Sequence, residues 1–165
     1  FHFIPPPLIW GFCGLIVLPK LSDNVNVQIT VEPLIVKQDW GKITAENRPE
    51  IEAERYKTGV LRYTFPTGES AASLIGRLTT FKDSIFEIQK NVGCDIVIFS
   101  HGFEFRVLLM IIMSWGEELF ESFGNPGNCE YRILTREEDG GYTLNNPLRK
   151  HGLPITRLQK GSSLL

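Results

Sequence analysis

The most regular pattern of apolar and polar positions lies between residues 70 and 92. Its apolar positions recur three or four residues apart, which is the spacing of one helix face. They are Ala71, Leu74, Ile75, Leu78, Phe81, Ile85, Ile88 and Val92. This spacing predicts an amphipathic helix of about six turns, which ends at Gly93. The next residues, 95–99, form a continuous run rich in β-branched side chains, which is typical of a strand buried on both faces.

Shorter segments of the same kinds surround this helix and strand. Helices are predicted at 49–57, at 105–113 and at 117–123. Strands are predicted at 14–18, at 129–135 and at 142–144, with an Asp-Gly-Gly turn between the last two. This alternation of helices and strands predicts an α/β domain with a mainly parallel sheet, in which the strand at 95–99 is central.

The regularity of the pattern divides the chain into three parts. Residues 1–36 form an irregular N-terminal segment with one candidate strand at 14–18, and we expect this segment to pack less well than the rest. Residues 37–145 form the core, and residues 146–165 form a polar tail interrupted by prolines. With 165 residues, of which 42% are hydrophobic and 22% charged, the chain has the size and composition of one globular domain.

Charge and cysteine content exclude several classes of protein. A formal net charge of -2 gives no general attraction to nucleic acid or to an anionic membrane. The apolar run at 8–18 is too short to span a bilayer, which needs about 20 apolar residues. Cys13, Cys94 and Cys129 form no disulfide framework and have no metal-ligand spacing. We therefore expect a cytoplasmic protein with reduced thiols and without a metal or other cofactor, and the sequence does not indicate its oligomeric state.

The short sequence Ser100-His101-Gly102 directly follows the strand predicted at 95–99. Ligands of parallel α/β sheets bind at the carboxyl ends of the strands, so His101 stands where a functional side chain is expected. Gly102 allows the backbone to approach a ligand closely, and the helix after it offers N–H groups to an anion. The alternative is a histidine that only caps backbone groups at the end of the strand.

Several short motifs occur in an order that points to one protein family. They are Gln38-Asp39-Trp40-Gly41, the block with Pro66, Gly68, Glu69 and Ser70, the helix residue Arg77, the block Ser100-His101-Gly102 with Arg106 after it, and the segment 125–134. Each motif is weak alone, but together their order and spacing resemble the histidine phosphatase superfamily, in its phosphoglycerate-mutase-like branch. The resemblance covers residues 38–137.

The resemblance implies a three-layer sandwich and the hydrolysis or transfer of phosphomonoesters through a phosphohistidine. In that chemistry one histidine attacks phosphorus, a second histidine and cations bind the phosphoryl oxygens, and a carboxyl group protonates the leaving group. His101 corresponds to the second, phosphate-binding histidine, and Gly102 to a phosphate-binding backbone group. The implied ligand is a phosphate-bearing small molecule. The remaining motif residues are expected to be structural, and they are Gly68, Glu69, Ser70, Arg77 and Arg106.

The chain departs from the family at the positions of the reacting groups. No Arg-His-Gly occurs in the 165 residues. If the strand at 14–18 is the first strand of the family, Lys20 and Leu21 occupy the places of the arginine and the nucleophile, and Leu21 is expected near His101. Lys37 occupies the place of the acid. The N-terminal third is therefore expected to be truncated or aberrant. Two hypotheses follow, a domain that lacks turnover and a truncated product of an active phosphohydrolase.

A third hypothesis assigns a different nucleophile, Ser70. The sequence Gly-Glu-Ser-Ala-Ala is similar to the Gly-x-Ser-x-Gly elbow of α/β-hydrolases, and Asp139 and His151 follow in the order of a hydrolase triad. Against this hypothesis, Ala72 replaces the second glycine, and a Pro-Thr pair interrupts the strand that an elbow needs. The favoured interpretation is a turn that leads into the helix at 70–92.

Overall fold

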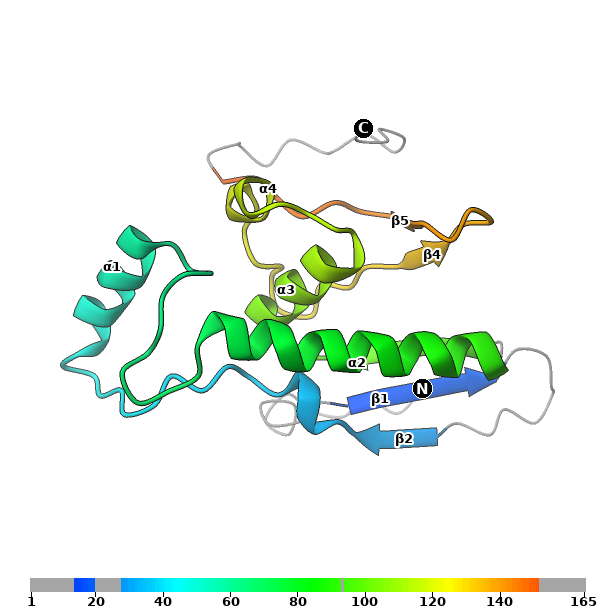
Figure 1. Cartoon of the computed structure of the whole chain (residues 1–165), viewed down its shortest axis with the longest axis horizontal. Helices are drawn as coiled ribbons and strands as arrows, with labels where there is room; N and C mark the ends of the chain where they lie inside the picture. The colour runs from blue at the N-terminus through cyan, green and yellow to red at the C-terminus, as the bar shows by residue number, and fades with distance from the viewer. Residues whose placement is uncertain (1–13, 20–27, 93, 152–165) are drawn as a thin grey trace.

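The computed structural model describes residues 14–19, 28–92 and 94–151 (Figure 1). In chain order the elements are β1 (Gly14–Pro19), β2 (Gln28–Val31), the 3-10 helix η2 (Pro33–Ile35), α1 (Arg48–Thr58), α2 (Ala71–Val92), β3 (Cys94–Phe99), α3 (Gly102–Ile112), α4 (Glu117–Ser122), β4 (Leu134–Arg136) and β5 (Tyr142–Leu144). Figure 1 shows the α/β arrangement, with α2 running along a small sheet and α1 set at one end. Within the described ranges, every helix is too short or too polar to cross a membrane.

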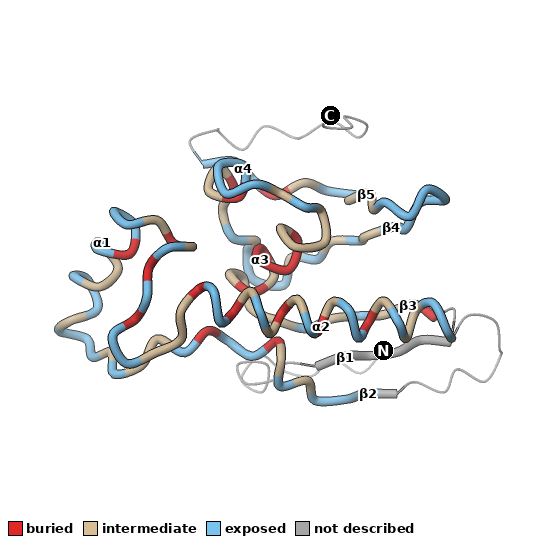
Figure 2. The backbone as a smooth tube through the Cα atoms, viewed as in Figure 1, coloured by how far each residue is buried: buried red, intermediate tan, exposed pale blue. Residues whose placement is uncertain are grey.

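The long helix α2 confirms the element predicted from the apolar period. It begins after Ser70, whose hydroxyl accepts the backbone N–H of Ser73 at 3.1 Å, as a helix N-cap does. The apolar face of α2 is buried, and Figure 2 shows buried residues recurring along α2 and α3. The main core contains Ile35, Val60, Leu74, Leu78, Phe81, Ile85, Val107, Leu108 and Phe120.

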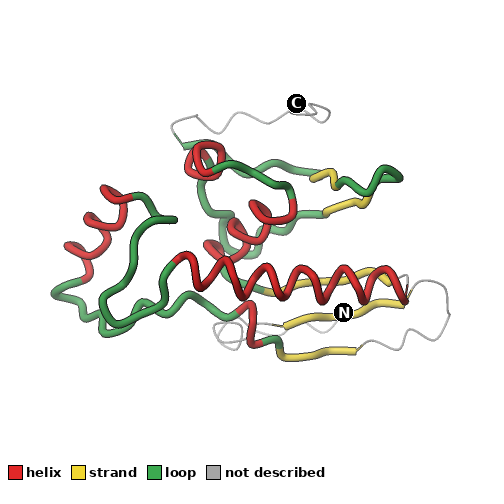
Figure 3. Tube along the Cα trace, viewed as in Figure 1, coloured by secondary structure: helices red, strands yellow, loops and turns green. Residues whose placement is uncertain are grey.

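The first three strands form one antiparallel sheet in the order β2-β1-β3. Gly14 of β1 is opposite Phe99 of β3, and Pro19 is opposite Cys94. Residues 20–27 connect β1 to β2, which is too short for a parallel crossover, since such a connection needs about a dozen residues or more. The strands β4 and β5 form a separate antiparallel hairpin (Figure 3).

The prediction of a mainly parallel three-layer sandwich with a central strand at 95–99 is wrong for the described strands. β3 lies at an edge of the sheet, and its one described neighbour is antiparallel. β3 also buries a single face, because Ile96 and Ile98 pack against the core whereas Val97 and Phe99 are exposed. A β-branched run predicts a strand but not its neighbours, which depend on distant segments. The neighbour of β3 in this sheet is β1.

The direction of β1 affects where Lys20 and Leu21, the residues expected at the places of the family's arginine and nucleophile, can lie. Lys20 and Leu21 lie outside the described residues. The strand before them, however, ends with Pro19 opposite Cys94, at the end of β3 that is far from His101. An antiparallel β1 therefore does not support the expectation that Leu21 lies near His101.

The other predicted elements lie close to the observed ones, with two differences. α3 begins at Gly102 rather than at residue 105, and only the end of the strand predicted at 129–135 is present, as β4. Cys129 has a φ of 60°, which interrupts the extended backbone before β4. Part of the segment predicted to be irregular forms β2 and η2, and Ile35 is fully buried. Since the two ends of the chain lie outside the described residues, the division into three parts stays a prediction.

Candidate functional site

The candidate site lies where β3 passes into α3. Ser100 follows the strand, His101 is the N-cap residue of α3 with extended backbone (φ -106°, ψ 163°), and Gly102 is the first residue of the helix. The His101 side chain makes no capping hydrogen bond to α3, and the His101 carbonyl accepts the N–H of Phe105 at 2.8 Å. The N-terminus of an α-helix, which favours anions, therefore lies directly beside His101.

A second motif segment contacts the start of this helix. A Cβ atom placed on Gly102 would lie 3.2 Å from the Cβ of Asn125, which is tighter than an ordinary side-chain contact. Asn125 begins the segment 125–134 that contributed to the family resemblance. The glycine thus allows this loop to approach α3 closely, and the two motif segments are neighbours in space.

Two hydrogen bonds tie the segment that precedes Trp40 to the start of α3. The hydroxyl of Ser100 donates to the carbonyl of Ile35 at 3.0 Å. The backbone N–H of Gln38 donates to Oε1 of Glu104 at 2.6 Å, and the Glu104 side chain is only 1% exposed. The two chain segments therefore run alongside each other over a length of about four residues.

This pairing involves the residues on either side of Lys37, which the family resemblance places at the position of the acid. Lys37 precedes Gln38 in one segment, and His101 follows Ser100 in the other. The exposed Lys37 makes no ion pair within the described part of the chain. Lys37 thus belongs to a segment that is hydrogen-bonded to the end of β3 and to the start of α3.

The Pro-x-Gly-Glu-Ser block packs backbone to backbone against the Gln-Asp-Trp-Gly block. A Cβ atom on Gly68 would lie 2.4 Å from the carbonyl oxygen of Asp39, and Gly41 adopts a φ of 70°, with Thr67 against it. Hydrogen bonds hold the contact, from the N–H of Glu69 to the Asp39 carbonyl (2.7 Å) and from the Gln38 amide to the Glu69 carbonyl (3.1 Å). The two glycines are therefore structural requirements of this contact.

Arg77 of α2 holds the chain just before Lys37. Its guanidinium binds the Glu69 carboxylate with two hydrogen bonds of 2.7 and 2.9 Å. It also donates to the carbonyl of Leu34 at 2.5 Å and to that of Val36 at 2.8 Å. All four bonds go to protein groups, so in this structure Arg77 and Glu69 join α2 to the segment before Lys37.

Two further arginines are buried against aromatic rings. Arg106 donates to the carbonyl of Phe123 at 2.6 Å and lies 4.2 Å from the ring centroid of Phe120. Arg55 of α1 lies 4.5 Å from the ring centroid of Phe103, and its Nε and Nη2 have no hydrogen-bond partner. Burial lowers the pKa of both arginines. Arg106 thus connects α3 to the residue that follows α4, and its printed hydrogen bond goes to a protein carbonyl.

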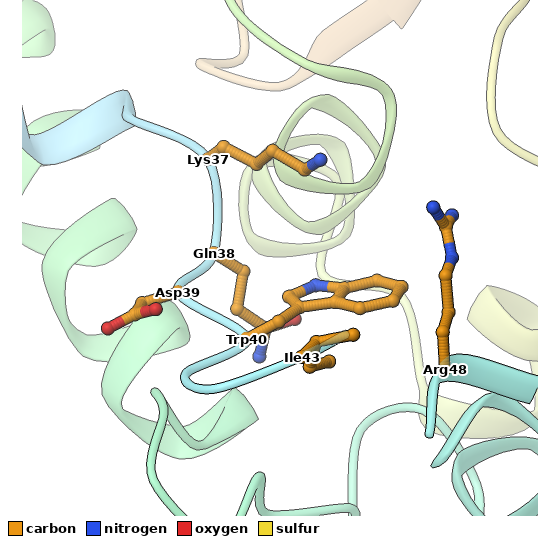
Figure 4. A pocket seen from close by; sticks show the side chains of 6 residues that line it. All are labelled: Lys37, Gln38, Asp39, Trp40, Ile43 and Arg48. Atoms are coloured by element: carbon orange, nitrogen blue, oxygen red, sulfur yellow. The ribbon is translucent and has the colours of Figure 1, made fainter. Parts of the chain in front are cut away.

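A shallow pocket opens beside Trp40 (Figure 4). Its volume is about 270 Å³. In Figure 4, Lys37 and Arg48 extend on two sides of the indole, whereas Asp39 points away from it. The lining residues are Lys37, Gln38, Asp39, Trp40, Ile43 and Arg48. Two of the lining residues, Lys37 and Gln38, belong to the segment that is hydrogen-bonded to the start of α3.

The structure does not assemble the triad of the esterase hypothesis. Ser70 begins α2, and Asp139 lies in the turn after β4. The hairpin of β4 and β5 packs on the other end of α2, where Tyr142 stacks on Phe86 with a centroid distance of 5.1 Å. Asp139 is engaged locally, as its Oδ1 accepts the N–H of Gly141 at 2.8 Å. The Ser70 hydroxyl caps a helix instead.

Three features of the site were not predicted from the sequence. Glu104 lies in a helix whose other residues are mostly apolar, and a charge inside an apolar run was the available signal. Arg55 lies in a strongly polar helix, where no pattern marks one charge as buried. The pocket at Trp40 depends on contacts between distant segments. Within the described residues, no cluster of His, Cys, Asp or Glu side chains could hold a metal ion.

Comparison with known proteins agrees with the motifs. A family model described as "Histidine phosphatase superfamily (branch 1)" matches residues 19–146. The chain is 33% identical over 134 residues to "Phosphoglycerate mutase-like protein AT74" of Arabidopsis thaliana, a match that covers 76% of this chain and 42% of that protein. It is 32% identical over 133 residues to "Broad-range acid phosphatase DET1" of Saccharomyces cerevisiae, covering 76% and 40%. The chain thus spans less than half the length of these relatives. No solved structure matches it significantly.

Proposed function

Because the chain belongs to the histidine phosphatase superfamily (branch 1), we propose that it binds a phosphate-bearing small molecule at the start of α3 without turning it over. The binding groups in this proposal are His101, the backbone N–H of Gly102 and the ammonium group of Lys37. One observation carries the proposal: the hydrogen bonds of Ser100 and Gln38 hold the Lys37 segment alongside the helix terminus that bears His101.

The physical argument for binding is the coincidence of three favourable terms for an anion. A helix N-terminus offers unpaired N–H groups and the positive end of the helix dipole. A lysine and a histidine add charge-assisted hydrogen bonds, each with a net stabilisation of about 1.5–3 kcal/mol. An arginine fork, which usually dominates phosphate recognition, is not among these groups. We therefore expect phosphate affinity in the millimolar range or weaker.

The argument against turnover rests on the missing reacting groups. The 165 residues contain no Arg-His-Gly, so the motif that bears the family's nucleophile is lacking. The position of the family's acid is Lys37, and an ammonium group with three N–H donors binds phosphate oxygens but is a much weaker proton donor than a carboxyl group. The same substitution that removes the acid thus adds a cation for binding.

Binding and turnover are tested on the same purified chain. Titration of inorganic phosphate, followed by chemical shifts of the His101 and Gly102 amides, should show weak saturable binding. Lys37→Glu should weaken that binding about tenfold or more, since the substitution removes a charge-assisted bond and adds a like charge. Lys90→Glu makes the same change of charge near the end of α2 and should leave binding unchanged.

Turnover should be absent with p-nitrophenyl phosphate and with 3-phosphoglycerate. Hydrolysis above background that disappears in His101→Ala would overturn the proposal, because another residue would then supply the nucleophile. No detectable binding of phosphate in the wild-type chain would overturn its binding half. A cytoplasmic location and the exclusion of nucleic-acid partners remain predictions from the sequence alone.

The size of the relatives favours one second candidate. Since the relatives are more than twice as long as the stretch they share with this chain, family hydrolysis by a longer protein containing this domain is the alternative. Sequencing of transcripts before the codon of Phe1 and between those of Leu18 and Gln38 tests it. An Arg-His-Gly in such a transcript, together with hydrolysis by the encoded protein, would favour the second candidate over the first.

A further inference from the structure

The pocket beside Trp40 has a rigid aromatic wall. The indole of Trp40 stacks on Phe65 with a centroid distance of 5.0 Å and an interplanar angle of 22°. The guanidinium of Arg55, a residue only 7% exposed, lies 5.2 Å from the same indole. A ring held on these supports is available for stacking without much further loss of conformational freedom.

The same wall carries positive charge. Nζ of Lys37 and Cζ of Arg48 each lie 5.9 Å from the Trp40 ring centroid, on two sides of the pocket (Figure 4). The one carboxylate of the lining, Asp39, accepts the N–H of Gly41 at 2.8 Å and points away from the indole. An aromatic surface between two cations suits a ligand that combines a flat ring with negative charge.

A buried acceptor in the pocket lining is left without a donor. Gln38 is 3% exposed, and its amide nitrogen donates to the Glu69 carbonyl, whereas its Oε1 has no hydrogen-bond partner in the described structure. An unsatisfied buried acceptor costs free energy in the unliganded protein. A ligand that carries an O–H or N–H group would satisfy this acceptor, whereas an unsubstituted aromatic ring would not.

We propose that this pocket binds the aromatic ring of a small aryl phosphate, with the ring stacked on Trp40 and the phosphate directed to Lys37 and the start of α3. The volume of about 270 Å³ suits a ligand of this size, since sites for drug-sized molecules occupy roughly 300–1,000 Å³. The inference names the ligand class for the proposed phosphate site and rests on that proposal. It adds that ring recognition, by Trp40, is separate from phosphate recognition.

The test compares two probes that differ only in the ring. Phenylphosphonate and methylphosphonate carry the same non-hydrolysable anionic group, and their dissociation constants for the wild-type chain are measured by NMR titration. Phenylphosphonate should bind about three- to tenfold more tightly, as expected for one added stacking contact. Trp40→Leu should reduce this ratio to about one. Trp115→Leu is the matched control and should keep the ratio, because Trp115 packs on Phe123 in another cluster.

The outcomes separate this inference from the proposed function. Equal affinity for the two probes would overturn the ring site while leaving the phosphate site intact. Binding of phenylphosphonate without binding of methylphosphonate or inorganic phosphate would overturn the phosphate site and leave the ring site. If Trp40→Leu fails to fold, intermolecular NOEs between the phenyl protons and the Trp40 indole of the wild-type chain decide the matter, and their absence would overturn the inference.

Discussion

Replacing Arg77 by methionine should destabilise the protein strongly, although Arg77 is not among the proposed phosphate ligands. The substitution keeps most of the apolar side-chain volume and removes the guanidinium. It leaves the Glu69 carboxylate without its ion-pair partner and the carbonyls of Leu34 and Val36 without their donor. The segment that places Lys37 beside α3 then loses its main attachment to α2.

The magnitude follows from the burial of the ion pair. The side chains of Arg77 and Glu69 are 16% and 14% exposed. Breaking a fully buried pair costs about 3–5 kcal/mol, and partial exposure reduces this figure because water screens the remaining charge. The two lost backbone hydrogen bonds add about 1 kcal/mol each at most. The expected loss is about 3 kcal/mol of unfolding free energy, a large part of the roughly 5–15 kcal/mol typical of a domain.

Urea unfolding followed by far-ultraviolet circular dichroism measures this loss. With an m-value of about 2 kcal/mol/M, the midpoint of Arg77→Met should fall by about 1.5 M. Arg48→Met is the control, since the pair of Arg48 with Glu52 has side chains 61% and 36% exposed and should contribute less than about 0.5 kcal/mol. A midpoint shift for Arg77→Met no larger than that of the control would refute the reasoning. The double variant with Glu69→Leu should show a coupling energy of about 2 kcal/mol.

Three further predictions concern packing and pH. Gly68→Ala should lower the unfolding free energy by about 2 kcal/mol or more, because its Cβ would lie 2.4 Å from a carbonyl oxygen. Gly76→Ala in α2 meets open space and should raise the unfolding free energy by about 0.5–1 kcal/mol. The urea midpoints of both variants measure these changes. The hydrogen bond from Arg62 lowers the pKa of Glu117, so the stabilisation is present above the unfolded pKa and is lost as the pH falls through the folded one. The melting-temperature difference between wild type and Glu117→Gln should therefore shrink between pH 6 and about pH 3, and a constant difference would contradict the assignment. Arg55→Met should stay within about 1 kcal/mol of wild type in the same urea assay, because it removes two buried nitrogen atoms without hydrogen-bond partners together with its cation–π contacts. A loss near 3 kcal/mol would show that the cation–π contacts dominate.

The local sequence was sufficient to predict those helices and strands whose pattern of apolar and polar residues lies within one continuous segment. The apolar period between residues 70 and 92 predicted both ends of α2 within one residue, because the residues of the buried helix face recur every three or four positions along the chain. The end of β3 and the position of His101 after it were predicted for the same reason. The motif order also identified the family, because glycine and arginine at fixed spacing reflect backbone contacts such as that of Gly68 with Asp39.

Strand direction and the contents of the site were decided by the tertiary structure. β1 pairs antiparallel with β3, and no property of either strand's own residues specifies that direction, since an antiparallel and a parallel neighbour present the same side chains to a core. The Lys37 segment is held against the start of α3 because Ser100 binds Ile35 and Gln38 binds Glu104, contacts between residues 65 and 66 positions apart in the chain. Such contacts form when distant segments pack, so the motifs indicated the position of Lys37 in the family pattern but not the hydrogen bonds that hold its segment.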